Sequence, residues 1–252
     1  MQNKFSIIMV CKNSEKTIEE SINSFFDQDY IKKNLIIIDG GSNDRTVEII
    51  KNYKSIKYFE KINNLGLYAS INYGIKKSND DIIGILHSDD TFFDKNTLTK
   101  INSAFENNTI KPDYVYSNIV FIDNLKVIKR TWVSGEIKND EHKLGKFPAH
   151  TGIFLNKSVF DKIGFYDESL KISSDISFIY KLFENKELFG RYLDIYSIKM
   201  KLGGLSTKSF RNILIANFES FIALKNLKIS YIKVLKIIFL KIFNKIGQIK
   251  KK

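Results

Sequence analysis

The sequence predicts an α/β protein, with a mostly parallel sheet flanked by helices and a basic helical extension at its C-terminal end. Three observations support this prediction. Over about the first 90 residues, short apolar runs alternate with segments of helical periodicity. Polar residues follow directly after three of these apolar runs. The excess of basic over acidic residues lies entirely in residues 199–252.

Composition sets the outer limits of the interpretation. The chain has 252 residues, of which 43% are hydrophobic and 27% charged. These values exclude a mostly disordered chain and fit one large domain, or one domain with a small appendage. Cys11 is the only cysteine. An internal disulfide and a cysteine-based zinc site are therefore excluded, which suits a reducing compartment.

The first half of the chain is expected to alternate strand and helix. Continuous apolar runs predict buried strands, and apolar residues that return every three or four positions predict helices. Ser14 is the expected N-cap of the first helix, in which Ile18, Ile22 and Phe25 share one face. The expected strands are 5–10, 35–38, 56–59 and 82–86, and the other expected helices are 46–53 and 67–77.

The second half has a less regular pattern. Residues 114–122 predict a strand, with 126–133 as its hairpin partner, and 154–163 and 174–183 predict helices. A turn is expected at the paired glycines near residue 203.

The C-terminal segment carries the whole net charge of +12. Residues 199–252 contain thirteen Lys or Arg and a single acid, Glu219. Within this segment, 229–246 alternates Ile, Leu and Phe with Lys and predicts a basic amphipathic helix on an anionic membrane surface. The alternative is a helix that packs on the rest of the chain or on another subunit. No nucleic-acid partner is expected, because no recognition motif accompanies the charge.

No targeting or membrane-spanning segment is expected. The apolar run 5–11 is too short for the core of a signal peptide. No window holds the roughly 18 apolar residues that a transmembrane helix requires.

Polar residues at three predicted strand ends indicate a ligand site. In parallel sheets, ligands bind at the carboxyl ends of the strands. Lys12-Asn13, Asp39-Gly40 and Asp89-Asp90 occupy such ends. The adjacent carboxylates of Asp89 and Asp90 repel one another unless a cation or hydrogen-bond donors offset them. A divalent ion carrying a nucleotide diphosphate would do so, and a solvated turn is the alternative.

Asp39 is also open to two interpretations. A carboxylate at a strand end can accept hydrogen bonds from a base or a ribose, and the glycines after it allow close approach of a ligand. Alternatively, Asp39 or Ser42 caps the following helix. The segment is neither a Gly-x-Gly-x-x-Gly dinucleotide motif nor a Walker loop, which disfavours nicotinamide and P-loop chemistry.

Five short motifs, in this order, resemble those of family 2 glycosyltransferases, which have the GT-A fold. The resemblance covers about residues 4–206. The motifs are Ile38-Asp39-Gly40-Gly41-Ser42-Asn43-Asp44-Arg45-Thr46, Asn64-Leu65-Gly66-Leu67-Tyr68-Ala69-Ser70-Ile71-Asn72, Leu86-His87-Ser88-Asp89-Asp90, His150-Thr151-Gly152-Ile153-Phe154 with Gly164-Phe165-Tyr166-Asp167-Glu168, and Ser173-Ser174-Asp175-Ile176-Ser177-Phe178.

The resemblance implies roles for individual residues. Asp175 would be the general base that deprotonates the acceptor hydroxyl, and Asp90 would bind Mn²⁺ or Mg²⁺. Asp39 would recognise the base, and Asp89 would lie near the ribose and diphosphate. His87 and His150 are candidate contacts to acceptor or phosphate. The implied donor-binding set is Cys11, Lys12, Asn13, Asp39, Gly66 and Asp89.

Several positions depart from the family pattern. His87-Ser88 and Ala69-Ser70 stand where an acid is common, and Ser174 replaces the acid that often precedes the catalytic aspartate. No Gln-x-x-Arg-Trp sequence follows Asp175, and the single tryptophan is Trp132. Family members that polymerise processively carry that motif, so the resemblance implies addition of a single sugar.

The expected function is transfer of a sugar from a nucleotide-diphosphate donor, with UDP favoured, to a hydroxyl of a cell-surface glycan precursor. That precursor could be lipid-linked, at the cytoplasmic face of a bacterial membrane. Residues 1–206 would form the catalytic domain, with a nucleotide-sugar half (1–110) and an acceptor half (111–206), and 207–252 the basic extension. Two alternatives stay open: a non-catalytic, membrane-associated partner with the same fold, and a sugar-phosphate nucleotidyltransferase. The latter would need a glycine-rich loop after the first strand, where the chain has Cys11-Lys12-Asn13-Ser14.

Overall fold

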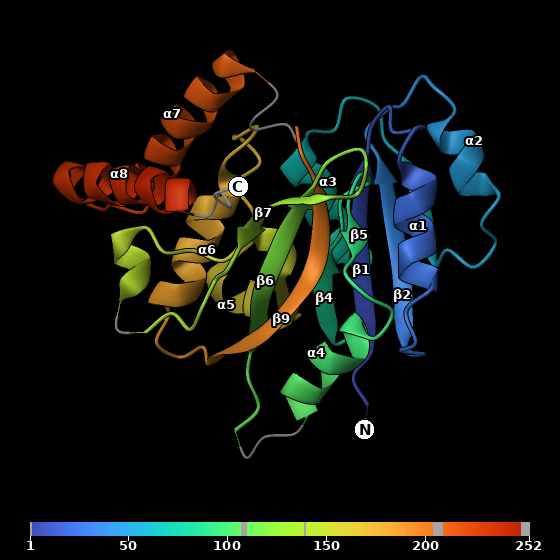
Figure 1. The fold of residues 1–252 in the computed structure, drawn as a ribbon, viewed down its shortest axis with the longest axis horizontal. Helices are drawn as coiled ribbons and strands as arrows, with labels where there is room; N and C mark the ends of the chain where they lie inside the picture. Colours follow the sequence, from blue (N-terminus) through green and yellow to red (C-terminus); the bar gives the residue numbers. More distant parts are fainter. Residues whose placement is uncertain (1, 107–109, 139, 204–208, 248–252) are drawn as a thin grey trace.

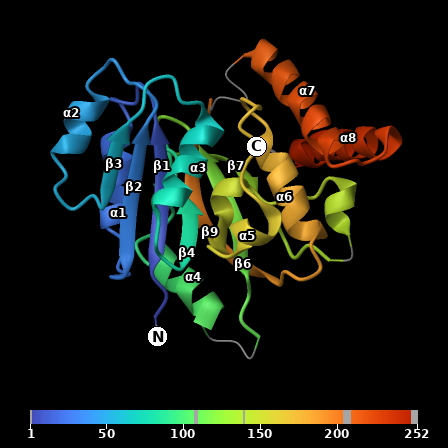
Figure 2. The same ribbon diagram turned by 180° about the vertical axis from the view of Figure 1, so that it is seen from behind.

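A computed structural model describes residues 2–106, 110–138, 140–203 and 209–247. They form one nine-stranded sheet with helices on both faces and two further helices at one end (Figures 1 and 2). The strands follow the order β3-β2-β1-β4-β8-β6-β9-β5, and β7 pairs with β6. The predicted α/β class, with a mostly parallel sheet between helices, is confirmed.

The first four strands are the parallel part of the sheet. Strand β1 (Phe5–Cys11) lies between β2 (Lys33–Asp39) and β4 (Ile82–Ile85), and β3 (Tyr58–Lys61) pairs with β2. Because these strands are parallel, their carboxyl ends meet at one edge of the sheet.

The second half of the chain extends this sheet. Antiparallel β8 joins β4 to β6, and the long β9 runs parallel to β6. The strands of this half are β5 (Thr91–Phe92), β6 (Tyr114–Ile122), β7 (Ile128–Trp132), β8 (Ile153–Asn156) and β9 (Gly190–Lys201).

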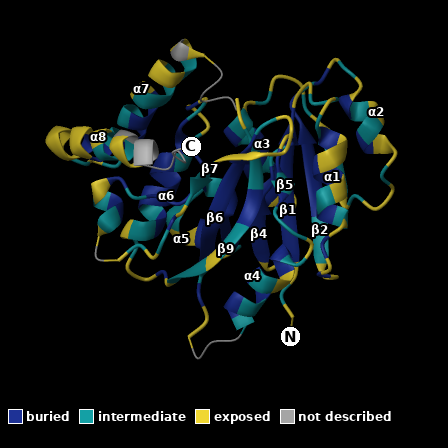
Figure 3. Cartoon of the chain, viewed as in Figure 1, coloured by how far each residue is buried: buried dark blue, intermediate teal, exposed yellow. Residues whose placement is uncertain are grey.

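Alternate residues of the strands bury opposite faces of the sheet. In β1, Ile7 and Met9 pack with α1 (Ile18–Phe26) and α4 (Thr97–Glu106), whereas Ile8 packs with helices of the other face. Figure 3 shows the strands as a continuous buried layer. The helices of the other face are α3 (Leu67–Lys77), α5 (Val159–Ile163) and α6 (Ser174–Glu184).

Two predictions about individual elements are wrong. Residues 153–156 form strand β8, not the start of a helix, and only Val159–Ile163 is helical. Ser14 does not cap α1, which begins at Ile18 with Thr17 as its N-cap. The Ser14 hydroxyl instead lies 2.9 Å from that of Ser88, so it links the loops that follow β1 and β4.

Short helical elements connect the strands near one edge of the sheet. Helix α2 (Thr46–Lys51) follows β2, and the single turns η1 (Glu141–Leu144) and η2 (His150–Gly152) lie between β7 and β8. The turn η2 contacts β4, β6 and β9, so it lies over the centre of the sheet.

The C-terminal helices form a hairpin that packs on α6. Helix α7 (Phe210–Asn226) contacts α6 and α8 (Tyr231–Gly247), and α8 also contacts η1. Figures 1 and 2 both place this hairpin beyond α6, at the end of the molecule away from α2. Among the described residues, no helix combines the length and the apolar character needed to cross a membrane.

Candidate active site

A cavity of about 1490 Å³ opens at the carboxyl ends of β1 and β4. The turn η2 and the start of α6 form its opposite side, and residues of α7 and α8 close one end. Most of the residues predicted for the site line it, from widely separated parts of the chain. These are Cys11, Lys12, Asn13, His87, Asp89, Asp90, His150 and Asp175.

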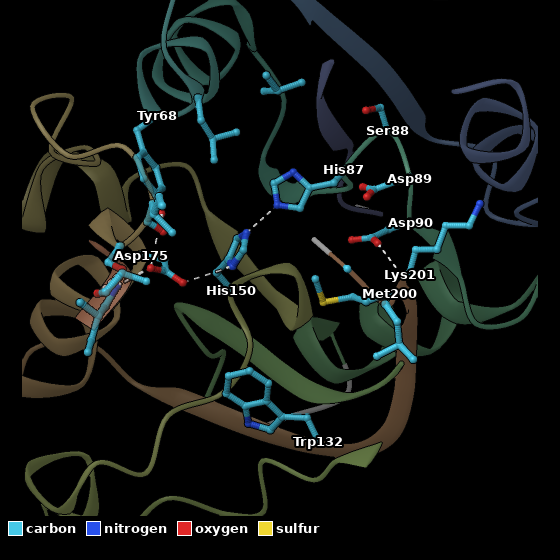
Figure 4. A pocket seen from close by; sticks show the side chains of 18 of the residues that line it. Tyr68, His87, Ser88, Asp89, Asp90, Trp132, His150, Asp175, Met200 and Lys201 are labelled. Atoms are coloured by element: carbon cyan, nitrogen blue, oxygen red, sulfur yellow. Dashed lines mark hydrogen bonds and ion pairs between the residues drawn. The ribbon is translucent and has the colours of Figure 1, made fainter. Parts of the chain in front are cut away.

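Asp90 is buried at one side of this cavity (Figure 4). Its Oδ1 atom accepts a hydrogen bond of 3.1 Å from the backbone N–H of Lys201. Its Oδ2 atom has no hydrogen-bond partner among the described residues. Burial and the charge of Asp89 raise the pKa of Asp90 well above its usual range. A buried oxygen without a partner, beside a second carboxylate, fits a hard divalent cation, which would offset both effects.

Asp175 lies in the first turn of α6, on the other side of the cavity. Its Oδ2 atom is 3.5 Å from Nδ1 of His150, and its Oδ1 atom accepts a 3.4 Å hydrogen bond from the Tyr68 hydroxyl. Burial alone would raise the pKa of Asp175. The hydrogen bond and charge of His150, with the charge of Lys241, outweigh burial and hold that pKa below its ordinary value. Asp175 is therefore a carboxylate at neutral pH.

Two histidines connect the two sides. The Nε2 atoms of His87 and His150 lie 2.8 Å apart, and Figure 4 shows the line from Asp175 through His150 to His87, beside the Asp89-Asp90 pair. Burial, followed by the charge of His150, lowers the pKa of His87 to about 3. His87 is therefore neutral near pH 7. The Nε2 contact needs one donor and one acceptor, so the two rings share a single hydrogen there.

Asp39 is predicted as a site residue, but its side chain does not line the cavity. It is fully buried, and its Oδ1 atom accepts backbone N–H groups of Gly41 (3.0 Å) and Ser42 (2.8 Å). The Ser42 hydroxyl and the Cys11 thiol donate to Oδ2. Asp39 thus stabilises the turn after β2. At the start of α2, the Oδ1 atom of Asp44 accepts the backbone N–H of Thr46.

The loops around that turn are tied together by Asn13. Its backbone is left-handed (φ 52°), its N–H donates to the Ser42 hydroxyl (2.8 Å), and its Oδ1 accepts the N–H of Asn43 (2.9 Å). Neighbouring Lys12 is exposed and lines the cavity. Gly66 is the N-cap of α3, and Leu65 and Leu67 beside it line the cavity in its place.

Three further lining residues are missing from the predicted set. Tyr68 donates a 2.6 Å hydrogen bond to the carbonyl of Ile172, and Lys201 brings the end of β9 to Asp90. Half-buried Lys241 of α8 faces the cavity, and its ammonium donates to the Ser220 hydroxyl (3.3 Å). Tyr68 belongs to a recognised motif, but no sequence signal places Lys241 near Asp175.

A second acidic cluster lies outside this cavity. Asp140, His142 and Glu184 could together reach a metal ion. Lys143 already forms ion pairs with Asp140 (3.3 Å) and Glu184 (3.0 Å), and Glu184 also contacts His142 at 2.8 Å. The lysine offsets the charge of this cluster, so Asp90 is the better-fitting metal ligand.

Comparison with known proteins agrees with this geometry. The fold is that of GT-A enzymes: the structure superposes on the 1–349 segment of Staphylococcus aureus TarS in complex with UDP-GlcNAc with a TM-score of 0.69. That match has 18% identity and covers 97% of this chain and 73% of the other. A mannosyltransferase from Pyrobaculum calidifontis, in complex with GDP-Man and Mn²⁺, gives a TM-score of 0.65 at 10% identity, with 97% and 70% covered.

Residues 6–164 match the model of glycosyl transferase family 2, and the chain belongs to this family. It is 25% identical over 186 residues to a poly-β-1,6-N-acetyl-D-glucosamine synthase of Staphylococcus epidermidis, with 70% of this chain and 45% of the relative covered. It is also 25% identical over 207 residues to a PGL/p-HBAD biosynthesis glycosyltransferase of Mycobacterium bovis, with 80% and 78% covered. The chain thus spans about half the length of the Staphylococcus epidermidis relative.

Proposed function

We propose that this protein is an inverting, non-processive glycosyltransferase. It would move a sugar from a nucleotide-diphosphate donor, with UDP favoured, to a hydroxyl of a cell-surface glycan precursor. The observation that carries this proposal is that ionised Asp175 and the Asp89-Asp90 pair line one cavity, on opposite sides of the His150–His87 contact. A base on one side and a charge-neutralising site on the other are what single-displacement transfer requires.

Asp175 would accept the proton of the acceptor hydroxyl as the hydroxyl oxygen attacks the anomeric carbon. The bond between that carbon and the phosphate oxygen would break, and its electron pair would leave with the nucleotide diphosphate. One displacement inverts the anomeric carbon, and no bond forms between sugar and protein. The depressed pKa of Asp175 keeps this group in the form that accepts a proton.

The leaving diphosphate would lie beside Asp89 and Asp90. When bound at Asp90, Mn²⁺ or Mg²⁺ would neutralise the charge that develops on the leaving group. The unpartnered Oδ2 atom of Asp90 supports this assignment. Exposed Lys12, which lines the same cavity, would contact a phosphate.

Cys11, Asn13 and Gly66 would contribute to donor binding indirectly, because they fix the conformation of the loops around the cavity. Asp39 already accepts four hydrogen bonds, three from its own turn and one from the Cys11 thiol of β1. A direct contact of Asp39 with a base would therefore have to displace one of them. The first role of Asp39 is to hold this turn beneath the nucleotide.

We also propose that the C-terminal hairpin rests on an anionic membrane at the cytoplasmic face, where a lipid-linked acceptor would be met. At about 100° per residue, one side of α8 carries five exposed apolar side chains. They are Tyr231, Ile232, Leu235, Phe239 and Phe243. Exposed Lys233 and Lys236 flank that side, and Phe218 of α7 is also exposed. Apolar area bordered by lysines suits an anionic lipid surface.

Donor binding tests the first proposal. Calorimetric titration of a panel of nucleotide sugars, with Mn²⁺, Mg²⁺ or chelator, should give binding of a UDP-sugar that depends on the metal. Asp90→Asn should weaken that binding at least about tenfold, because the metal would lose a charged ligand. Asp161→Asn, on the exposed side of α5, is the matched control. Absence of binding for every nucleotide sugar under every metal condition would reject the enzyme proposal and favour the non-catalytic alternative.

Vesicle sedimentation tests the proposed membrane contact of the C-terminal hairpin. The protein should bind vesicles that contain phosphatidylglycerol and not vesicles of phosphatidylcholine alone, and Phe239→Glu should lower that binding. Leu125→Glu, at an exposed leucine in the β6–β7 turn, should leave it unchanged. Equal binding to both kinds of vesicle, or no effect of Phe239→Glu, would contradict the membrane proposal.

A further inference from the structure

The single acidic side chain of residues 199–252 is buried in the hairpin, facing the segment that leads to Asp175. Glu219 of α7 is 8% exposed. Its carboxylate accepts hydrogen bonds from three successive backbone N–H groups, those of Lys171 (3.1 Å), Ile172 (2.6 Å) and Ser173 (3.1 Å). Consecutive N–H groups that converge in this way form an anion-binding nest. Here the anion is supplied by the chain itself.

This carboxylate has no cation within ion-pair distance among the described residues. The Glu219 carboxylate is therefore stabilised by the N–H groups of 171–173, and it is the acceptor for the N–H of buried Ser173. The Ser173 hydroxyl adds a 2.8 Å hydrogen bond to the carbonyl of Ala216, one turn earlier in α7. The contact thus fixes backbone and side chain of the segment together.

The same segment is held from the opposite side by α3. The Tyr68 hydroxyl donates to the Ile172 carbonyl at 2.6 Å and also to Oδ1 of Asp175 at 3.4 Å. Helix α6 begins at Ser174, directly after the clamped residues. A shift of Ile172 or Ser173 would therefore move the first turn of α6 and change the 3.5 Å separation between Asp175 and His150.

We propose that Glu219 is a positioning residue for the transfer reaction: the C-terminal hairpin supplies a carboxylate that holds residues 171–173 and so aims Asp175 into the cavity. This inference rests on the proposed role of Asp175 as the base. It assigns the hairpin an internal function separate from any membrane contact, because Glu219 is buried whereas Phe218 beside it is exposed. The hairpin would then be part of the catalytic unit, with Lys241 facing the same cavity.

Glu219→Gln tests this proposal. Glutamine keeps the shape but loses the charge and one acceptor oxygen, so the nest is only partly filled. We expect kcat to fall at least about tenfold, because small displacements of a reacting group are costly. The Kd of the donor should stay within about twofold, since no donor-binding residue touches Glu219. Hydrogen exchange of the 171–173 amides should become faster. Glu187→Gln, an exposed glutamate between α6 and β9, is the matched control and should change none of these.

The outcomes separate this proposal from the proposed function. An unchanged kcat in a folded Glu219→Gln protein would overturn the positioning role and leave the transferase proposal intact. A parallel loss of kcat, donor affinity and thermal midpoint would also overturn it, because that pattern indicates general destabilisation. If the unmutated protein bound no nucleotide sugar and transferred none, the proposed function would fail, and the positioning proposal would fall with it. Glu219→Asp, which keeps the charge on a shorter side chain, should retain more activity than Glu219→Gln if charge in the nest is what matters.

Discussion

At the scale of single residues, the site depends on how Asp175 is kept ionised. Burial favours the protonated form of this carboxyl, and His150 and Lys241 oppose that effect. The Tyr68 hydroxyl and the backbone N–H of Ile176 (3.0 Å) also contact it. A carboxylate that is partly desolvated yet ionised is a stronger hydrogen-bond acceptor than one in open water, which suits it to take a proton from a hydroxyl.

The pH dependence of the rate should reveal this balance. Transfer needs the carboxylate form, so the rate is lost as pH falls through the pKa of Asp175, which lies below its ordinary value. His150→Gln removes the hydrogen bond and charge that lower the pKa and leaves burial, which raises it. We therefore expect the acid limb of the kcat profile to move to higher pH. His142→Gln, at a buried histidine outside the cavity, should leave the limb unchanged. A limb at the same or lower pH in His150→Gln would show that His150 does not set this pKa.

Much of the site could be predicted from the sequence, but its connections could not. Asp89 and Asp90 follow a buried apolar run, and Asp175 belongs to a recognisable motif. The contact of His87 with His150 joins residues 63 positions apart, and it exists because η2 packs on β4. The Glu219 clamp joins residues 46 to 48 positions apart. Such pairings follow from tertiary packing, for which a single sequence carries no local signal.

At the scale of elements, the position of the site depends on close packing between β4 and β8. Gly84 of β4 has no side chain because the ring of Phe154 in β8 and the tip of Ile7 occupy that space. A Cβ atom at Gly84 would lie 2.7 Å from Phe154 and 2.9 Å from Ile7. This close approach lets β8 pair with β4 and brings η2, with His150, over the sheet.

Gly84→Ala should therefore destabilise the protein by about 2 kcal/mol through overpacking. Urea unfolding would measure the free energy. In a Phe154→Leu background, where the ring is gone, the penalty of the same change should fall below about 1 kcal/mol. An equal penalty in both backgrounds would mean that Phe154 is not what excludes a side chain at Gly84.

Elements with a clear period could be predicted, and mixed ones could not. Helix α3 and strand β6 have the predicted bounds, because α3 keeps a helical period and β6 is a largely apolar segment buried at every position. The helix predicted over 154–163 is wrong because the apolar residues of a short strand and of a short helix, joined by two polar residues, happen to recur at helical spacing. Strand β9 has no expected counterpart, since most of its residues are only half-buried and polar residues interrupt it.

At the scale of the whole molecule, the cavity is built by the parallel strand ends, by η2 and by the C-terminal hairpin together. A ligand that fills it binds the folded chain and not the unfolded one, so it must stabilise the fold. UDP-sugar with Mn²⁺, at about 100 times its Kd, should add about 2.7 kcal/mol. For a chain of this length, the thermal midpoint should then rise by about 5–10 °C.

Removal of the metal should abolish most of that rise. Chelator should leave the midpoint close to that of the protein without ligand. Asp90→Asn, with binding at least about tenfold weaker, should lose about half of the rise or more, whereas Asp161→Asn should show the full rise. A full rise in the presence of chelator would contradict a role for Asp90 as a ligand to a metal that carries the diphosphate.

The most direct test of the central claim is the turnover of Asp175→Asn with the donor that binds best. Asparagine keeps the size of the side chain but cannot accept the acceptor proton. The account predicts donor affinity within about twofold of the unmutated protein and a loss of at least about 100-fold in kcat. Asp161→Asn should transfer normally. Retention of turnover by Asp175→Asn, with donor still bound, would contradict the assignment of Asp175 as the base and the mechanism built on it.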